Sequence, residues 1–147
     1  MKRLLPWCAL LLAAQFGHAT EPAEFDYMLN CQGCHLPDGM GNPQRQVPAF
    51  PGQLGLFLGV EGGREFLVQV PGSSLSGLTD EGLARVLNWM LERYAAAELP
   101  QGFEPYSAAE VQRWRHDVPN DVDAVRAQLI DRINQQQVLP AKESVGP

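Results

Sequence analysis

The amino-acid sequence predicts an all-α fold in which helices are joined by long loops. Apolar side chains recur at i, i+3, i+4, i+7 and i+8 within residues 83–91, which is one face of an amphipathic helix. A second apolar face with helical spacing lies within residues 122–133. The chain also has 14 glycines and 12 prolines, which favour long connections between helices.

These helices have recognisable starts. The Thr-Asp pair at residues 79–80 can cap the helix that carries residues 83–91, and acidic side chains suit its N-terminus. Residues 107–110 read Ser-Ala-Ala-Glu, a capping box that begins a second helix. Asn120 or Asp121 caps a third helix. Its expected apolar face consists of Val122, Val125, Leu129, Ile130 and Ile133.

The composition fits one globular domain. The chain has 147 residues, of which 45% are hydrophobic and 19% charged, enough for a single hydrophobic core. Its net charge is −6 and its isoelectric point is about 4.9. Binding to phosphate groups requires clustered lysine and arginine, so this acidic balance argues against nucleic acid as a partner.

Residues 1–19 have the features of a secretory signal peptide. Lys2 and Arg3 form a positive start, an apolar segment follows, and residues 17–19 read Gly-His-Ala, with small residues where signal peptidase cleaves. A retained membrane anchor is the alternative, but the apolar segment is short for a membrane span. We expect cleavage after Ala19 and export to a bacterial periplasm.

Removal of this segment changes the cysteine count and the charge. Cys8 is lost, and Cys31 and Cys34 remain. Nine basic residues then face 17 acidic ones, which gives a net charge of −8. No later stretch is long and apolar enough to cross a bilayer, so we expect no transmembrane segment in the mature chain.

Residues 31–35 read Cys-Gln-Gly-Cys-His, the C-x-x-C-H attachment signature of c-type haem. Two cysteines three residues apart can reach the two vinyl groups on one edge of a porphyrin and form thioethers. The histidine that follows can bind the iron from below the ring. Cys31 and Cys34 are therefore the predicted covalent haem ligands, and His35 is the predicted proximal iron ligand.

Other chemistries use a C-x-x-C pair. A thioredoxin-type redox pair normally lies near a βαβ pattern, which the surrounding sequence lacks. A zinc site would need more ligands, and His116 is the only other histidine of the mature chain. A disulfide across so short a loop is strained. An exported chain whose only two cysteines lie in C-x-x-C-H favours one covalently bound haem.

Further residues around the motif resemble class I c-type cytochromes. Tyr27 lies four residues before the first cysteine, where that family has an aromatic, and Ala23 occupies its small position, at which the first helix crosses the last. A Gly-rich stretch and Pro48 follow the histidine. The resemblance implies that the Pro48 carbonyl braces the His35 imidazole and sets its tautomer.

The resemblance covers residues 20–95, which it identifies as a cytochrome c domain with a helical fold around one haem. It extends to Leu-Thr-Asp-Glu at residues 78–81, followed by Trp89, which with Tyr94 is expected to pack on Tyr27 and wall the haem. The segment at residues 65–70 is β-branched, but the resemblance implies a helix there. Residues 96–140 form a helical C-terminal extension, expected mainly to add packing, with a cover over the haem pocket or a docking face as the alternatives. Residues 141–147 form a disordered tail.

The distal iron ligand is missing from its usual place. The resembled family has a methionine in the loop before the last helix, but here that loop, residues 71–76, has neither methionine nor histidine. Met90 is a candidate, although it falls at a core position of a helix. Met28 is expected in the core, Met40 follows His35 too closely, and His116 resembles a surface residue. An open or weakly ligated iron is the remaining outcome.

Two features near residue 62 suggest local roles. Glu-Gly-Gly at residues 61–63 lacks the lysine of a phosphate-binding loop, so it is expected to form a turn or helix cap. Arg64 is expected to be solvated, or else to pair with a haem propionate.

These features predict an electron-transfer protein that is not itself an enzyme. One haem c in an exported acidic domain would carry single electrons between redox protein partners that present a basic docking patch. Two alternatives stay open. The haem could bind or sense a small ligand at an open distal side, or the chain could be the haem subunit of a periplasmic dehydrogenase complex, with the C-terminal helices as its interface.

Overall fold

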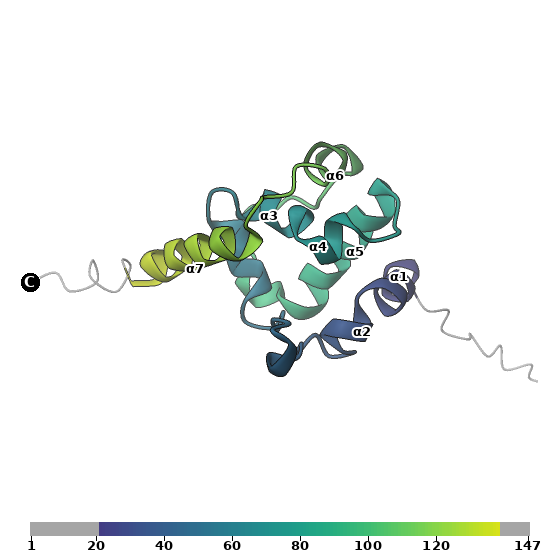
Figure 1. Ribbon diagram of the computed structural model, residues 1–147, viewed down its shortest axis with the longest axis horizontal. Coiled ribbons are helices and arrows are strands. Elements are labelled where there is room, and N and C mark those ends of the chain that lie inside the picture. Colours follow the sequence, from purple (N-terminus) through teal and green to yellow (C-terminus); the bar gives the residue numbers. More distant parts are fainter. Residues whose placement is uncertain (1–20, 139–147) are drawn as a thin grey trace, which may run out of the picture.

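The computed structural model describes residues 21–138, so the predicted signal peptide and disordered tail lie outside the described residues. Over that range the chain forms helices joined by loops, and the only β-type pairing is an isolated bridge between Asn42 and Val47 (Figure 1). The all-α prediction is therefore confirmed. The α-helices are α1 Pro22–Asn30, α2 Gln32–His35, α3 Gly63–Gln69, α4 Pro71–Ser74, α5 Asp80–Tyr94, α6 Ala108–Trp114 and α7 Val122–Val138, and the 3₁₀-helices are η1 Pro43–Arg45, η2 Leu54–Gly59 and η3 Ala96–Glu98.

Helix α5 is the centre of the core. Thr79 caps it, because its hydroxyl accepts a hydrogen bond of 3.1 Å from the Gly82 amide. The predicted apolar face is buried at every position, which confirms the helical periodicity. Its members are Leu83, Val86, Leu87, Met90 and Leu91.

Helix α1 crosses α5 at a small residue and an aromatic cluster. Ala23 and Tyr27 are each only 1% exposed. The Tyr27 ring lies 5.2 Å from Trp89 and 5.6 Å from Tyr94, which confirms that both α5 aromatics pack on it. The ion pair of Asp26 with Arg85 joins the two helices at their surface. These contacts hold α1, which directly precedes the first cysteine of the motif, against the core.

The segment at residues 65–70 is helical, as expected, and belongs to α3. Gly62 caps it with φ 82°, a left-handed conformation that favours glycine, so the predicted cap at residues 61–63 is confirmed. Gly63 lies directly against the Phe57 carbonyl, where any Cβ would overlap the backbone. This close approach packs α3 on η2, with Phe57 and Phe66 stacked at 5.7 Å.

The two C-terminal helices share the core of the preceding helices. Val111 of α6 is fully buried, and Leu129 and Ile133 of α7 are 2% and 7% exposed. Both predicted caps are present: the Ser107–Glu110 capping box begins α6, and the Asp121 carboxylate accepts a hydrogen bond from the Ala124 amide at the start of α7. Helix α6 packs on α5, and α7 packs on η2 at one side of the molecule (Figure 1).

Arg64 does not behave as the sequence suggested. It is partly exposed but bonded within the protein, because its guanidinium donates to Glu110 at 2.9 Å and to the Glu104 carbonyl at 2.8 Å. It also lies 4.1 Å above the Tyr106 ring. The guanidinium lowers the pKa of Glu110 to about 2. Arg64 therefore joins α3 to α6, a pairing across 46 positions of sequence that only the fold creates.

Within residues 21–138 no helix is both long and apolar enough to cross a membrane.

Candidate functional site

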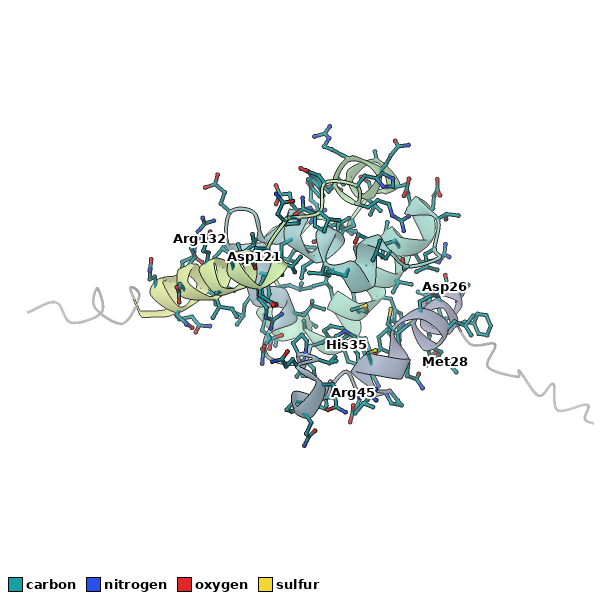
Figure 2. The ribbon with its side chains drawn as sticks, in the orientation of Figure 1. Asp26, Met28, His35, Arg45, Asp121 and Arg132 are labelled. Atoms are coloured by element: carbon teal, nitrogen blue, oxygen red, sulfur yellow. The ribbon has the colours of Figure 1, made fainter. Side chains whose placement is uncertain are left out.

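A cavity of about 360 Å³ lies inside the molecule, and Cys31, Cys34 and His35 all line it. The other lining side chains come from the loop after α2 and from η2, α3, α4, α5 and α7. In Figure 2, His35 lies toward the middle of the structure, whereas Met28 of α1 points away from it to the outside. The fold thus brings both cysteines and the histidine of the predicted motif to one cavity.

The backbone between α1 and α2 presents the two thiols together. The Cys31 amide donates to the Tyr27 carbonyl and ends α1, and the Cys31 carbonyl then accepts from the amides of Cys34 and His35 at 3.1 and 3.0 Å. Both thiols are free, with Cys31 half-buried and Cys34 exposed. Burial, with the nearby Asp26 carboxylate, raises the pKa of Cys31 to about 11, so this thiol is protonated at neutral pH.

A zinc site at the two cysteines finds no support in the geometry of the described residues. Across residues 21–138, no group of three or more His, Cys, Asp or Glu side chains is arranged to hold a metal ion, as a zinc site would require. His116, the one further histidine considered for such a site, is exposed and does not line the cavity.

His35 is held in one orientation. Its Nδ1 lies 3.2 Å from the Pro48 carbonyl, which can only accept, so Nδ1 carries the proton and Nε2 keeps its lone pair. This confirms the contact that the resemblance implied. The Phe50 ring stacks on the imidazole at 4.0 Å. Burial, with a smaller contribution from Arg126, lowers the pKa of His35, although the Pro48 hydrogen bond opposes the shift. The imidazole is therefore neutral at pH 7, the form that binds metals.

Gly41 makes the Pro48 contact possible. Its φ is 67°, and its amide donates to the His35 carbonyl at 3.1 Å. A Cβ at this position would overlap the carbonyl oxygen of Pro48. The backbone at residue 41 therefore approaches both His35 and the carbonyl that braces it, which only glycine permits.

The rest of the cavity wall is mostly apolar. Helices α3 and α5 contribute aliphatic and aromatic side chains, α4 contributes Pro71, Gly72 and Ser73, and Ser76 lies two residues beyond the end of α4. None of these four side chains contains sulfur or imidazole, so this wall offers no strong iron ligand.

Of the candidates for a distal ligand, only Met90 lines the cavity, where it is 6% exposed. Met40 is 52% exposed and lies elsewhere, and so does the exposed His116. The prediction that Met28 is in the core is wrong, since it is 47% exposed. Helix α1 turns its Ala23–Tyr27 face to α5, which leaves Met28 on the solvent side. Trp89 and Tyr94 also lie outside the cavity lining, so they pack on Tyr27 without forming its wall.

Helix α7 contributes the charged part of the cavity, which the sequence analysis missed. Asp123 and Arg126 are its charged lining residues, with Val122 beside them. The Arg126 guanidinium is 5.7 Å from the Phe57 ring, and partial burial lowers its pKa. The sequence did contain a signal: Arg126 is a lone arginine within the apolar face of the predicted helix. The C-terminal helices therefore do more than add packing.

Comparison with known proteins identifies the family. No protein-family model matches the chain. Two relatives, both named cytochrome c-552, come from Thermus thermophilus. Each is 34% identical over 134 residues, which cover 79% of this chain and 91% and 80% of the relatives. The chain belongs to the cytochrome c family. Proteins of this family carry covalently attached haem c, so haem c is the cofactor of this cytochrome, and its helices form a cytochrome c-like fold.

The contact between Gly41 and Pro48 can be tested by adding one methyl group. Gly41→Ala should lower the free energy of unfolding by about 1–3 kcal/mol beyond the strain of a left-handed residue, because its Cβ must displace the Pro48 carbonyl. A weaker hydrogen bond between His35 and the Pro48 carbonyl makes the imidazole a poorer electron-pair donor to the iron that it is expected to bind. The reduction potential of the haem should therefore rise. Denaturant unfolding and redox titration of the holoprotein measure both effects.

Gly52→Ala is the matched control. Gly52 has a similar φ of 73°, but no atom lies within 4 Å of its added Cβ. It should show the backbone strain alone and leave the reduction potential unchanged. Equal effects of both substitutions would contradict a role of Gly41 in placing Pro48.

Proposed function

We propose that this cytochrome is an exported monohaem electron carrier, in which Cys31 and Cys34 bind haem c covalently and His35 binds its iron. The observation that carries this proposal is geometric. All three side chains line one cavity, and the hydrogen bond from Nδ1 of His35 to the Pro48 carbonyl leaves the Nε2 lone pair free to bind a metal.

The cavity residues suit the parts of this cofactor. The two thiols suit its vinyl groups, and the apolar side chains of α3 and α5 suit its flat ring. Arg126 suits one of its carboxylates, because a guanidinium binds a carboxylate through two parallel hydrogen bonds. Haem supplies a one-electron couple, while the chain buries the ring and limits the access of water.

The carrier function is best served by Met90 as the distal ligand, because it is the methionine that lines the cavity. A second function is favoured by a different observation. The wall formed by Pro71, Gly72, Ser73 and Ser76 has no strong ligand, so an open iron could bind a small molecule such as carbon monoxide or nitric oxide.

Location and partners follow from the sequence. The signal peptide at residues 1–19 would direct the chain to a periplasm, and the net charge of −8 left after its removal would favour redox partners with a basic docking patch. A permanent place in a dehydrogenase complex is the variant of this proposal in which the partner stays bound, with helices α6 and α7 at the interface.

Covalent attachment is tested by the mass of the purified protein. Replacing both Cys31 and Cys34 by alanine should abolish covalent haem, because no other thiol remains in the exported chain. Either single substitution should leave one thioether. His116→Ala is the control, since that exposed residue does not line the cavity. Covalent haem that persists in the double variant would sink the proposed attachment site.

The distal ligand is tested by the optical spectrum of the oxidised holoprotein. With Met90 bound to iron, the weak far-red band of methionine ligation should appear in the native protein. Met90→Leu should abolish it at little cost in stability, because the two side chains have similar volumes. Met28→Leu and Met40→Leu are exposed controls and should retain the band. Absence of the band in the native protein, with rapid carbon monoxide binding after reduction, would favour the second function.

Electrostatic docking is tested by the salt dependence of electron transfer. With a basic redox protein as partner, the second-order rate should fall about tenfold as the ionic strength rises from about 10 mM to about 150 mM. An uncharged small reductant serves as the control and should show little change. A rate to the basic protein that does not respond to salt would remove the docking argument.

A further inference from the structure

A buried arginine at the C-terminal end of α6 holds the chain segment that joins the end of α4 to the start of α5. Arg115 is 8% exposed. Its Nη1 donates to the Leu78 carbonyl and to the Asp80 carboxylate, both at 2.9 Å. Its Nη2 donates to the carbonyls of Ser76 and Ser74 at 3.1 and 3.3 Å. One guanidinium therefore binds four acceptors within seven residues of another part of the chain.

This segment has few other means of fixing its backbone. Helix α4 is a single turn. The hydroxyls of Ser74 and of Ser76, which lies beyond the helix, donate only to the nearby carbonyls of Val70 and Ser73. Asp80 lies in the first turn of α5, so its ion pair with Arg115 ties the segment to the central helix. Without the guanidinium, the carbonyls of Ser74, Ser76 and Leu78 would have to bind water or change position.

The side of this segment that faces away from Arg115 forms a wall of the haem cavity. Ser73 and Ser76 line the cavity, as do Pro71 and Gly72 of α4, whereas Arg115 does not. In Figure 1, α4 lies across the middle of the molecule from α2, the helix that ends at His35, and α6 lies beyond α4 on the outside. Arg115 thus contacts the wall from behind.

We infer that Arg115 is a positioning residue that fixes the cavity wall facing His35 and so sets how readily an external ligand reaches the iron. The inference rests on the proposed haem site. His35 takes one face of the iron, so the wall opposite governs the other face, whether Met90 or no protein ligand is bound there. A wall held by four charge-assisted hydrogen bonds opens rarely, which slows the entry of a ligand.

The test is the rate at which reduced holoprotein binds carbon monoxide. Arg115→Gln should raise that rate about tenfold, because losing the charge-assisted bonds increases the open population by at least this factor. Arg115→Lys keeps the charge, but one ammonium cannot reach four acceptors. The carbon monoxide rate of this variant should therefore lie between those of the native protein and Arg115→Gln. If Arg115→Gln gives no folded holoprotein, the carbon monoxide rate of Arg115→Lys is compared with that of the native protein instead.

Val111→Ala separates positioning from simple stability. Val111 is fully buried on the same helix, and its truncation weakens the fold without removing any hydrogen bond to residues 74–80. It should lower the stability against denaturant while leaving the carbon monoxide rate near that of the native protein. Arg113→Gln, an exposed change on α6, should alter neither quantity.

The outcomes distinguish this inference from the proposed function. A rate that is unchanged in both Arg115 variants, or raised equally by Val111→Ala, would overturn the positioning role while leaving the haem site intact. A native protein without covalent haem would instead overturn the proposed function before any rate is measured.

Discussion

The position of the C-x-x-C-H motif depends on Tyr27. Its ring packs between Trp89 and Tyr94 of α5, and its hydroxyl donates to the Leu36 carbonyl at 2.6 Å. Leu36 directly follows the motif and has φ 64°, a left-handed conformation that costs energy for a leucine. Tyr27 therefore holds the chain just before the first cysteine and just after the histidine. Burial raises the pKa of Tyr27, so it remains a hydrogen-bond donor at any physiological pH.

The cavity is built from both ends of the described chain. The N-terminal part supplies the thiols and the imidazole, α3 and α5 supply apolar walls, and α7 supplies Asp123 and Arg126. Helix α6 acts from outside through Arg115. The C-terminal helices are thus part of the site's architecture, and their removal would expose the cavity as well as weaken the core.

Electrostatics divide the molecule into an interior with few charges and an acidic exterior. Inside, burial keeps His35 neutral, which suits an iron ligand. The chain as a whole is acidic, with a net charge of −6, which is the basis of the proposed docking to basic partners. In the proposed electron carrier, the protein would supply the mostly apolar surroundings of the haem, and the haem would supply the one-electron couple.

The sequence alone determined helices α5, α6 and α7, their caps and the motif. Those features depend on hydrogen bonds and side-chain spacing within a few residues, as with Thr79 at α5 and the Ser107 capping box. Tertiary structure decided how distant segments meet. It paired Arg64 with Glu110, buried Arg115 against residues 74–80, placed Arg126 in the cavity and left Met28 in solvent. These outcomes join residues about 40 or more positions apart, or depend on which face of a helix meets the core, and no local pattern encodes either.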